Sequence, residues 1–546
     1  MVALFLPAHA VLARPRLLAP LLGGLAACGF QPLALWPLTI LAIAALIELV
    51  ARARSGRQAT LIGWLFGVGH FTIGNNWIAT AFIYQANMPA WLGWIAVVLL
   101  SLYLAVYPAL ATAAAWAIAR GGQAGDGRRA SERLRFLGLA FVACWIVSEW
   151  LRGWVFTGFA WNPLGVALLG GDHAPGLARL APFTGTYGLA GVLVAIAALL
   201  RQGIARSFGG AGAARVATLA GLIAGAALLT LAMVVPARAP PQPAGSLPFT
   251  LVQPDIRQER LDDPRHYEAN FQREAALSVA TRPGALRLLL WPESALPDYL
   301  RDGYPPPYYE ASTYAADPLL ARQRLAGIIG PRGLLLTGVV DLVIRDGHAV
   351  AARNAVTALD ENGAIVAGYS KAHLVPYGEY LALRWLLEPL GATRLVPGAL
   401  DFEAGPGPRT IDLGAWGRAG IQICYEITFS GAVVDPRHRP DYIFNPSNDG
   451  WFGSWGPPQH LAQARLRAIE EGLPVLRSTT TGISAVIGPD GTVRQHLARL
   501  TAGRLDGVVP YAAPPTLFAR WGNALPLALA AIVLAISLVA MRRAKR

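Results

Sequence analysis

Eight apolar stretches dominate this sequence, and each comes close to the length of a membrane-spanning helix. A helix that crosses about 30 Å of hydrocarbon needs about 20 predominantly apolar residues. The stretches lie at residues 17–31, 34–50, 59–83, 90–118, 136–151, 186–200, 216–235 and 523–541. Only 14% of the residues are charged, against about 25% in soluble proteins. The sequence therefore predicts a polytopic α-helical membrane bundle of eight spans.

The distribution of charge excludes a nucleic-acid groove and predicts an orientation. The net charge is +13, but residues 237–520 hold 27 basic and 28 acidic residues and are nearly neutral. The excess lies in short loops between the apolar stretches, including Arg120 to Arg135, and in the C-terminal tail. By the positive-inside rule, both termini are expected in the cytoplasm and residues 237–520 outside it.

A soluble domain is expected after the proline-rich linker 236–246. Strand-sized apolar runs replace the long ones there, at residues 249–253, 288–290, 333–340, 355–359, 420–423 and 442–444. Helical patterns lie between or after several of them, as at residues 460–471. The expected organisation is a seven-span membrane domain at 1–236, an α/β sandwich domain at 237–520, and a last span with a basic tail at 521–546.

Cys424 is the only thiol in the expected soluble domain, because Cys28 and Cys144 fall within predicted spans. It follows a buried apolar strand, where a strand-to-helix turn can present a nucleophile beside backbone N–H donors. A lone cysteine is more often a small buried hydrophobic residue. Two further residues favour the interpretation of Cys424 as a nucleophile.

Lys371 is the only lysine in the expected soluble domain, in a chain that uses arginine for 44 of its 46 basic residues. A compact ammonium group can approach an oxyanion where a planar guanidinium group does not fit. Chance retention of one lysine is the alternative. The residue choice favours a functional role.

Glu293 follows a short apolar strand, in the sequence Trp-Pro-Glu. Functional sites of α/β folds assemble at strand ends, and a carboxyl group beside tryptophan in a partly dry pocket suits general base work. By itself the motif does not single out Glu293, because 28 acidic residues lie in this domain.

Taken in chain order, Glu293, Lys371 and Cys424 resemble the Glu-Lys-Cys triad of the nitrilase superfamily. The surrounding motifs resemble the apolipoprotein N-acyltransferase family over nearly the whole chain. They are Trp-Pro-Glu293, the run Lys371 to Tyr380, Ile423 to Glu426, Asn448 to Gly453, Gly456 to His460, Ala464 to Glu471, Arg477 to Gly482 and Glu149 to Gly153. The resemblance implies an α-β-β-α nitrilase-like domain outside the cytoplasm, anchored in the bacterial inner membrane.

The resemblance also implies a reaction. Cys424 would attack an acyl ester of a phospholipid and form a thioester, and the amine of a diacylated apolipoprotein would then take the acyl chain. Glu293 would move the protons, while Lys371 and the N–H of Tyr425 would hold the oxyanion. Glu379, Tyr425 and Glu426 would support the site, with structural hydrogen bonding as their alternative role.

No metal, cofactor or nucleic acid is expected, and His373 and His460 are interpreted as structural. The protein is expected to act as a monomer. Trp385, together with the aromatic stretch Tyr304 to Tyr309, is expected to form a lipid-contacting rim around Cys424, with core packing as the alternative.

The chain departs from the family pattern at three places. Ala160 and Ala382 stand where the family usually has proline, and the region around Asp262 lacks an expected tryptophan. These departures concern loop geometry and an acyl-contacting position, and they leave the triad intact.

Two other functions compete with acyl transfer. A membrane-tethered amidase could use the same triad, although seven spans before the domain are excessive for a tether. A transporter with a soluble appendage would need paired intramembrane charges and internal repeats. Glu48 and Glu149 lie near predicted span ends instead, and no repeat is found.

Overall fold

The computed structural model describes residues 14–84, 89–120, 136–236, 245, 247–387, 389 and 400–543. Three predicted features fall mostly outside these residues: the basic loop before residue 136, the proline-rich linker, and the end of the basic tail. The chain forms two compact units. One comprises Met1–Ala79, Trp91–Ala237 and Arg520–Arg546, and the other Thr80–Ala90 and Arg238–Ala519.

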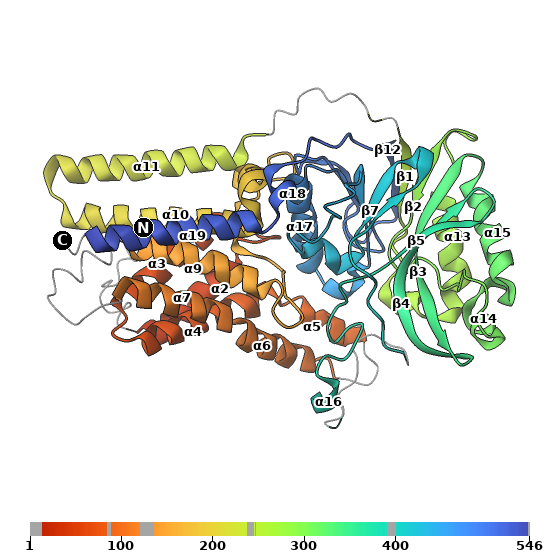
Figure 1. The fold of residues 1–546 in the computed structure, drawn as a ribbon, viewed down its shortest axis with the longest axis horizontal. Coiled ribbons are helices and arrows are strands. Elements are labelled where there is room, and N and C mark those ends of the chain that lie inside the picture. The colour runs from red at the N-terminus through yellow and green to blue at the C-terminus, as the bar shows by residue number, and fades with distance from the viewer. Residues whose placement is uncertain are drawn as a thin grey trace. The chain divides into compact units, whose positions relative to one another are not determined.

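The first unit is helical, and a helix occurs at each of the eight predicted spans (Figure 1). Its longer helices are α2 (Pro15–Ala27), α3 (Trp36–Arg52), α4 (Gly56–Gly74), α6 (Leu92–Leu104), α7 (Val106–Arg120), α9 (Leu137–Arg152), α10 (Ala181–Gly209), α11 (Gly212–Val234) and α19 (Ala524–Arg543). The short helices η2 (Leu164–Leu168) and η3 (Gly176–Leu180) complete it. By residue number, α5 (Ile78–Ala81) and α18 (Leu517–Trp521) each extend across the boundary between the two units, and η1 (Phe82–Tyr84) belongs to the second unit.

Four helical segments of the described residues are long and apolar enough to cross a membrane. They are Leu92–Arg120, Gly176–Phe208, Gly212–Val234 and Ala524–Arg543. The other four predicted spans correspond to α2, α3, α4 and α9. Of these, α9 has 16 residues, which gives a length of about 24 Å, less than the hydrocarbon thickness.

Local sequence explains where two predicted spans are interrupted. The stretch 90–118 breaks between α6 and α7, just before Pro108, because proline lacks the N–H that would continue the helix. The stretch 59–83 ends its first helix at Gly74, where the adjacent Asn75 and Asn76 are polar. These breaks were not indicated by hydropathy alone.

Close helix packing holds the first unit together. Helix α4 packs against both α2 and α7, and α9 packs against α7, α10 and α19 (Figure 1). A Cβ atom at Gly23 would lie only 2.0 Å from the Phe66 carbonyl oxygen, so glycine is required where α2 crosses α4. Small residues at such crossings are typical of helices packed in membranes.

The second unit contains two six-stranded sheets, in the orders β12-β1-β2-β3-β4-β5 and β11-β10-β9-β8-β7-β6. The central strands β1, β2 and β3 run parallel, as do β7, β8 and β9. The strands are β1 (Pro248–Gln253), β2 (Arg287–Leu290), β3 (Gly333–Arg345), β4 (His348–Asp360), β5 (Ile365–Ser370), β6 (Thr410–Asp412), β7 (Arg418–Ile421), β8 (Tyr442–Ser447), β9 (Val475–Thr479), β10 (Ala485–Ile487), β11 (Val493–His496) and β12 (Gly503–Val508).

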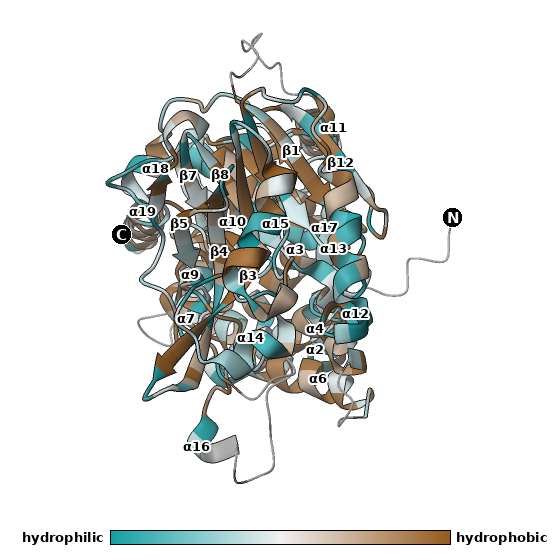
Figure 2. Cartoon of the chain, turned by 90° about the vertical axis from the view of Figure 1, so that its right-hand side faces the viewer, coloured by the Kyte–Doolittle hydropathy of each residue, from teal (hydrophilic) through white to brown (hydrophobic). Residues whose placement is uncertain are grey.

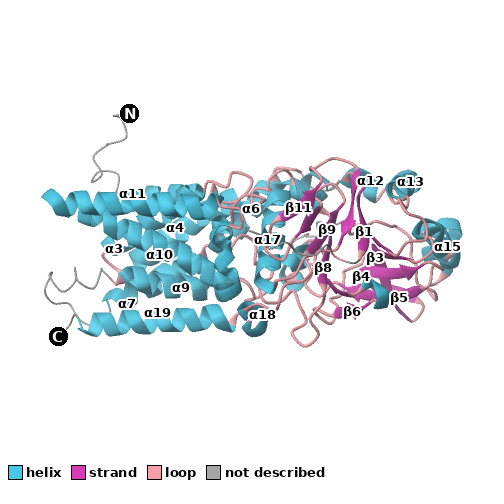
Figure 3. Cartoon of the chain, turned by 90° about the horizontal axis from the view of Figure 1, so that it is seen from above, coloured by secondary structure: helices cyan, strands magenta, loops and turns pink. Residues whose placement is uncertain are grey.

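Helices cover the outer faces of the two sheets (Figure 3). Helices α13 (Tyr267–Leu277) and α15 (Pro318–Ile329) share an apolar core with β1, β2 and β3. Helix α17 (Gly456–Glu471) shares another core with β8, β9 and β10. Figure 2 shows β1 in hydrophobic colours and α12 in hydrophilic ones. The predicted layered α/β sandwich is confirmed.

All six strand-sized apolar runs form strands. The remaining strands, β5, β6 and β9 to β12, are shorter or more polar and were not indicated. The unit also contains the short helices α12 (Gln258–Leu261), η4 (Pro264–His266), α14 (Pro306–Ser312), η5 (Tyr314–Ala316), α16 (Arg384–Leu387), η7 (Gly414–Trp416), η8 (Cys424–Thr428) and η9 (Asp449–Phe452).

The segment Thr80–Ala90 belongs to this second unit, which the sequence did not indicate. The ring of Tyr84 packs edge-on against Trp451, with 5.7 Å between the ring centroids.

Candidate active site

The residues expected in the site lie where strands of both sheets end. Glu293 comes three residues after β2, Lys371 directly after β5, and Cys424 three residues after β7. Because β4 is antiparallel to both β3 and β5, the carboxyl end of β5 lies at the same edge as that of β3. The topology thus brings distant parts of the chain together at one edge.

Glu293 and Lys371 meet in a ring of hydrogen bonds that also contains Glu379 and Asn354, and all four side chains are buried. Lys371 Nζ lies 2.9 Å from Glu379 Oε1 and 3.5 Å from Glu293 Oε1. Asn354, on β4, donates from Nδ2 to Glu293 Oε1 at 2.7 Å and to Glu379 Oε1 at 2.8 Å. One ammonium group and one amide therefore hold two carboxylates.

The second carboxylate oxygen of Glu293 is also held in place. The backbone N–H of Asn448 donates to Glu293 Oε2 at 2.7 Å. The backbone of Glu293 packs tightly against β3, where a Cβ atom at Gly338 would lie 2.7 Å from the Glu293 Cα. The Glu293 carboxylate therefore points in a fixed direction.

The two carboxylates determine the charge state of Lys371. Burial by itself would lower the pKa of Lys371, but the charges of Glu379 and Glu293 outweigh burial and raise the pKa above its ordinary value. Lys371 therefore stays protonated as an ammonium group that can stabilise negative charge.

Cys424 begins the short helix η8 with a left-handed backbone, at φ +51. Such a conformation costs a residue other than glycine of order 1–3 kcal/mol and persists only where surrounding contacts enforce it. Burial raises the pKa of the Cys424 thiol, Glu293 raises it further, and Lys371 opposes them. The resting sulfur is therefore a thiol, and a base must remove its proton during attack.

Glu426 links the turn that contains Cys424 to the loop that contains Lys371. Its Oε1 accepts hydrogen bonds from Tyr369 Oη at 2.8 Å, from the Ala372 N–H at 2.8 Å and from the His373 N–H at 3.1 Å. Its Oε2 accepts from the Ile423 N–H at 2.8 Å. Burial raises the pKa of Glu426 to about 7, although these donors counteract part of the shift.

Tyr425 and Trp385, the other expected site residues, differ in their exposure. Tyr425 is buried and packs edge-on against Phe429, with 5.0 Å between ring centroids. Trp385, on α16, is 76% exposed, and no hydrogen bond, ion pair or ring contact joins it to the triad in the described part of the chain.

The aromatic stretch Tyr304 to Tyr309 packs into its own domain. Tyr309 is buried, and its hydroxyl donates to the Arg301 carbonyl at 2.6 Å. The hydroxyl of Tyr304 accepts a hydrogen bond from the Leu342 N–H at 3.0 Å. Core packing thus describes Tyr309, whereas Tyr304 and Tyr308 are half-buried and Pro306 and Pro307 are exposed.

Sequence reasoning missed Asn354 altogether, because an asparagine just before the predicted strand 355–359 carries no signal of its own. It used Asn448 only as part of a motif. His460 was interpreted as structural, but its ring lies against the backbone of Cys424, with Nε2 3.0 Å from the Cys424 carbonyl oxygen.

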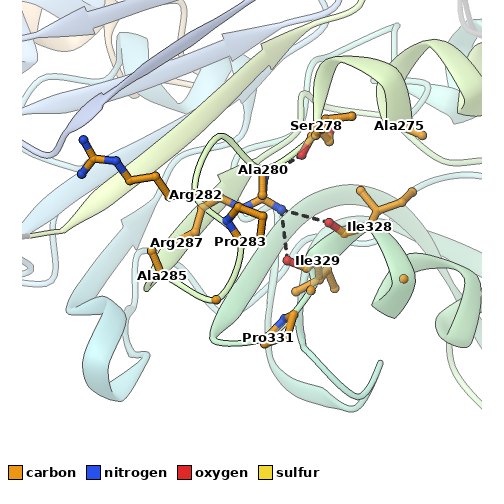
Figure 4. A pocket seen from close by; sticks show the side chains of 14 residues that line it. Ala275, Ser278, Ala280, Arg282, Pro283, Ala285, Arg287, Ile328, Ile329 and Pro331 are labelled. Carbon is orange, nitrogen blue, oxygen red and sulfur yellow. Dashed lines mark hydrogen bonds between the residues drawn. The ribbon is translucent and has the colours of Figure 1, made fainter.

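A pocket of about 300 Å³ lies elsewhere in this unit, between the end of α13 and the end of α15 (Figure 4). The Arg287 guanidinium group donates to the carbonyl oxygens of Ser278, Ile328 and Ile329 beside it. None of the expected site residues lines this pocket. The described residues also contain no cluster of three or more His, Cys, Asp or Glu side chains suited to a metal ion.

Comparison with known proteins defines the class. Residues 250–506 match the carbon-nitrogen hydrolase family, and residues 22–199 match the apolipoprotein N-acyltransferase N-terminal domain. An amidase from Nesterenkonia sp. is 21% identical, covering 49% of this chain and 92% of that chain with a TM-score of 0.33. The two family matches define a membrane protein with a nitrilase-superfamily domain.

Curated relatives match almost the whole chain. The apolipoprotein N-acyltransferase of Bradyrhizobium diazoefficiens is 35% identical over 96% of this chain and 94% of its own length. That of Rhodopseudomonas palustris is 33% identical over 96% of this chain and 95% of its own length. The chain belongs to the apolipoprotein N-acyltransferase family. Neither a tethered amidase nor a transporter would give full-length matches of this kind.

Proposed function

We propose that the protein transfers an acyl chain from a membrane phospholipid to the N-terminal amine of a diacylated apolipoprotein, through a thioester on Cys424. Family membership over nearly the full length supports the reaction. The observation that carries the assignment of residues is the buried ring in which Lys371 Nζ lies 3.5 Å from Glu293 Oε1, together with the effect of both charges on the pKa of the Cys424 thiol.

In the first half-reaction, Glu293 takes the thiol proton while Cys424 Sγ attacks the carbonyl carbon of the acyl ester. The Lys371 ammonium group and the Tyr425 N–H stabilise the oxyanion of the tetrahedral intermediate. Collapse of this intermediate breaks the ester C–O bond, and the proton held by Glu293 passes to the departing alkoxide. The products are a thioester and a lysophospholipid.

In the second half-reaction, the α-amine of the diacylglyceryl-cysteine attacks the thioester carbonyl. Glu293 accepts a proton from the amine, and the same donors stabilise the second oxyanion. The C–S bond breaks, an amide forms, and the thiol of Cys424 is regenerated. The chain's own residues supply every proton transfer, and no cofactor is required.

Three further residues have supporting roles in this proposal. Glu379 holds the ammonium group of Lys371 in place, because its Oε1 accepts from Nζ and its Oε2 accepts from the Val375 N–H at 2.7 Å. Glu426 fixes the loop of the nucleophile against residues 372 and 373. Tyr425 contributes its backbone N–H.

Mass spectrometry of the purified protein after incubation with phospholipid tests the proposal. We expect one acyl adduct per chain, on the peptide that contains Cys424, with an equal amount of lysophospholipid. Addition of a diacylated lipopeptide should remove the adduct and produce a triacylated lipopeptide. Lysophospholipid without an adduct or an acylated acceptor would identify a hydrolase instead.

The membrane arrangement is also a proposal. We expect eight spans, with α2, α3, α4 and α9 crossing in addition to the four long apolar segments. The catalytic unit is expected on the outer side of the bacterial inner membrane, because the basic residues gather in the opposite loops. One chain supplies the whole triad, so the protein is expected to act as a monomer.

Cysteine labelling measures the orientation. In a background without Cys28, Cys144 and Cys424, a cysteine replaces either Gly125, outside the described residues, or His348, which is exposed at the start of β4. An impermeant thiol reagent added to intact spheroplasts should label position 348 and reach position 125 only after the membrane is opened. The reverse pattern would place the catalytic unit in the cytoplasm and contradict the proposal.

We expect Trp385 to contact lipid, because it is 76% exposed and Leu383 close by is 54% exposed. Tryptophan favours the headgroup region of a bilayer. Trp385→Ala combined with Leu383→Ser should slow acylation by phospholipid in membranes severalfold. Acylation by a water-soluble short-chain ester should not change.

A matched control for this prediction is Leu319→Ser, which removes an equally exposed leucine from α15 of the same unit. It should leave both reactions unaffected. Equal loss with the phospholipid and the soluble ester in the Trp385 variant would show that the substitutions disturb the fold, and lipid contact would then be rejected.

A further inference from the structure

His460 contacts the backbone of Cys424 and belongs to a fully buried polar cluster. The cluster joins three elements: His460 from α17, Asp449 from η9 and Arg477 from β9. Arg477 donates to both carboxylate oxygens of Asp449, at 2.8 and 2.7 Å. Ser447 Oγ also donates to Asp449 Oδ1, at 2.7 Å. The cluster therefore forms a rigid support beneath the imidazole ring.

The contacts of the ring determine which nitrogen carries the proton. His460 Nε2 lies 3.0 Å from the Cys424 carbonyl oxygen, which can only accept a hydrogen bond. Nε2 therefore carries a hydrogen and donates it. His460 Nδ1 lies 3.1 Å from Arg477 Nη2, which can only donate, and 3.1 Å from Asp449 Oδ1, which can only accept.

The pKa of His460 reflects its burial and its charged neighbours. Burial lowers the pKa of His460, the Arg477 guanidinium group lowers it further, and Asp449 opposes them. In either charge state of the ring Nε2 keeps its hydrogen, because the Cys424 carbonyl oxygen can only accept. Arg477 also holds the pKa of Asp449 well below its usual range, against the effect of burial, so Asp449 stays ionised.

The carbonyl that His460 binds belongs to the same peptide group as the Tyr425 N–H. A trans peptide group is planar, and its C=O and N–H point in opposite directions. Holding the Cys424 oxygen on the His460 side therefore directs the Tyr425 N–H the opposite way. The left-handed backbone of Cys424, at φ +51, makes an external constraint on this peptide necessary.

We propose that His460 is a positioning residue for the oxyanion site: by donating from Nε2 to the Cys424 carbonyl, it orients and polarises the peptide whose N–H, on Tyr425, binds the oxyanion. A hydrogen bond accepted by an amide carbonyl strengthens the N–H of that amide as a donor. This inference deepens the proposed function and rests on its assignment of Cys424 as the acylated residue.

Two variants of nearly equal shape test the role of the donor. His460→Gln places an amide nitrogen as many bonds from Cβ as the imidazole Nε2, so the donor to the Cys424 carbonyl is kept. His460→Met has a similar volume and no donor. His460→Asn is the second comparison, because its amide nitrogen corresponds to Nδ1 and does not reach the carbonyl.

Two reactions of Cys424 separate the oxyanion site from the thiol. Acylation by p-nitrophenyl butyrate passes through a tetrahedral oxyanion and releases p-nitrophenolate in a measurable burst. Alkylation by iodoacetamide displaces iodide without forming an oxyanion. Loss of one oxyanion donor elsewhere costs about a hundredfold to a thousandfold in rate. A misdirected donor is expected to cost about tenfold to a hundredfold.

We expect His460→Met and His460→Asn to lose at least tenfold in the acylation rate, with KM for the ester and the alkylation rate changing less than threefold. His460→Gln should keep at least a third of the acylation rate. Acylation of His460→Met or His460→Asn within threefold of wild type would overturn the proposal. So would a parallel loss of acylation and alkylation, or a His460→Gln protein as slow as His460→Met.

The ester assay also tests the role of His460 independently of the acyl donor assigned in the proposed function. A wild-type protein that is acylated by the ester but not by phospholipid would refute the acyl donor assigned above. The comparison among the His460 variants would still decide the role of His460.

Discussion

Replacing Cys424 with alanine or serine is expected to abolish acyl transfer, with a loss of several orders of magnitude in rate. Alanine removes the nucleophile. Serine retains a hydroxyl group, but its pKa lies far above that of a thiol, and the burial that already raises the pKa of the thiol disfavours an alkoxide even more. Removal of the nucleophile costs about a millionfold in a well-studied hydrolase.

The two other cysteines provide matched controls. Cys28 and Cys144 lie in the helical unit, and Cys28→Ala and Cys144→Ala should leave acyl transfer largely intact. The measurement is the amount of radiolabelled acyl chain that stays bound to the protein after denaturation, together with triacylated lipopeptide formed. A comparable loss from Cys28→Ala would remove Cys424 from its assigned role.

Local signals favoured Lys371 and Cys424, whereas Glu293 was singled out only by the resemblance of the three residues to the nitrilase triad. Glu293 and Lys371 each follow a strand end, and Lys371 and Cys424 each belong to a residue type that the soluble domain otherwise lacks. Strand ends of a parallel sheet meet at one edge whatever the loops between them do. The structure brings Glu293 and Lys371 within 3.5 Å of each other although they are 78 residues apart.

The residues around the triad could not be predicted in the same way. Asn354 reaches Glu293 and Glu379 because β4 pairs with β3 on one side and with β5 on the other, in registers that no strand encodes alone. The contact between His460 and the Cys424 carbonyl joins a helix to a turn 36 residues away. Such contacts depend on how strands pair and how helices pack against them. The spacing of apolar residues and the scarcity of a residue type describe only one strand or helix at a time.

In the helical unit, hydropathy predicted where helices occur but not where they are interrupted. Hydropathy located a helix for each predicted span, because long apolar runs have few other structures available in lipid. It did not indicate the break before Pro108 or the end of α4 at Gly74, since both depend on backbone hydrogen bonding. Length and composition qualify four helical segments of the described residues as candidate spans.

Lys371→Arg is expected to be nearly as damaging as Lys371→Ala, although it keeps the positive charge. The Lys371 side chain is 1% exposed, and its Nζ lies 2.9 Å from Glu379 Oε1. A guanidinium group is planar and larger, so it would have to displace Asn354 or one of the carboxylates it bridges. The compact ammonium group that faces the oxyanion would be lost in both variants.

Thioester formation with a labelled phospholipid measures the effect, and Lys545→Arg, which alters the only other lysine in the chain, serves as the control. We expect full activity for Lys545→Arg and a loss of at least a hundredfold for Lys371→Arg. If Lys371→Arg kept more than about a tenth of the wild-type rate, a loss below roughly 1.4 kcal/mol, charge alone would account for the role of Lys371. The close contact with the oxyanion would then have to be abandoned, and with it the explanation for a lone lysine in an arginine-rich domain.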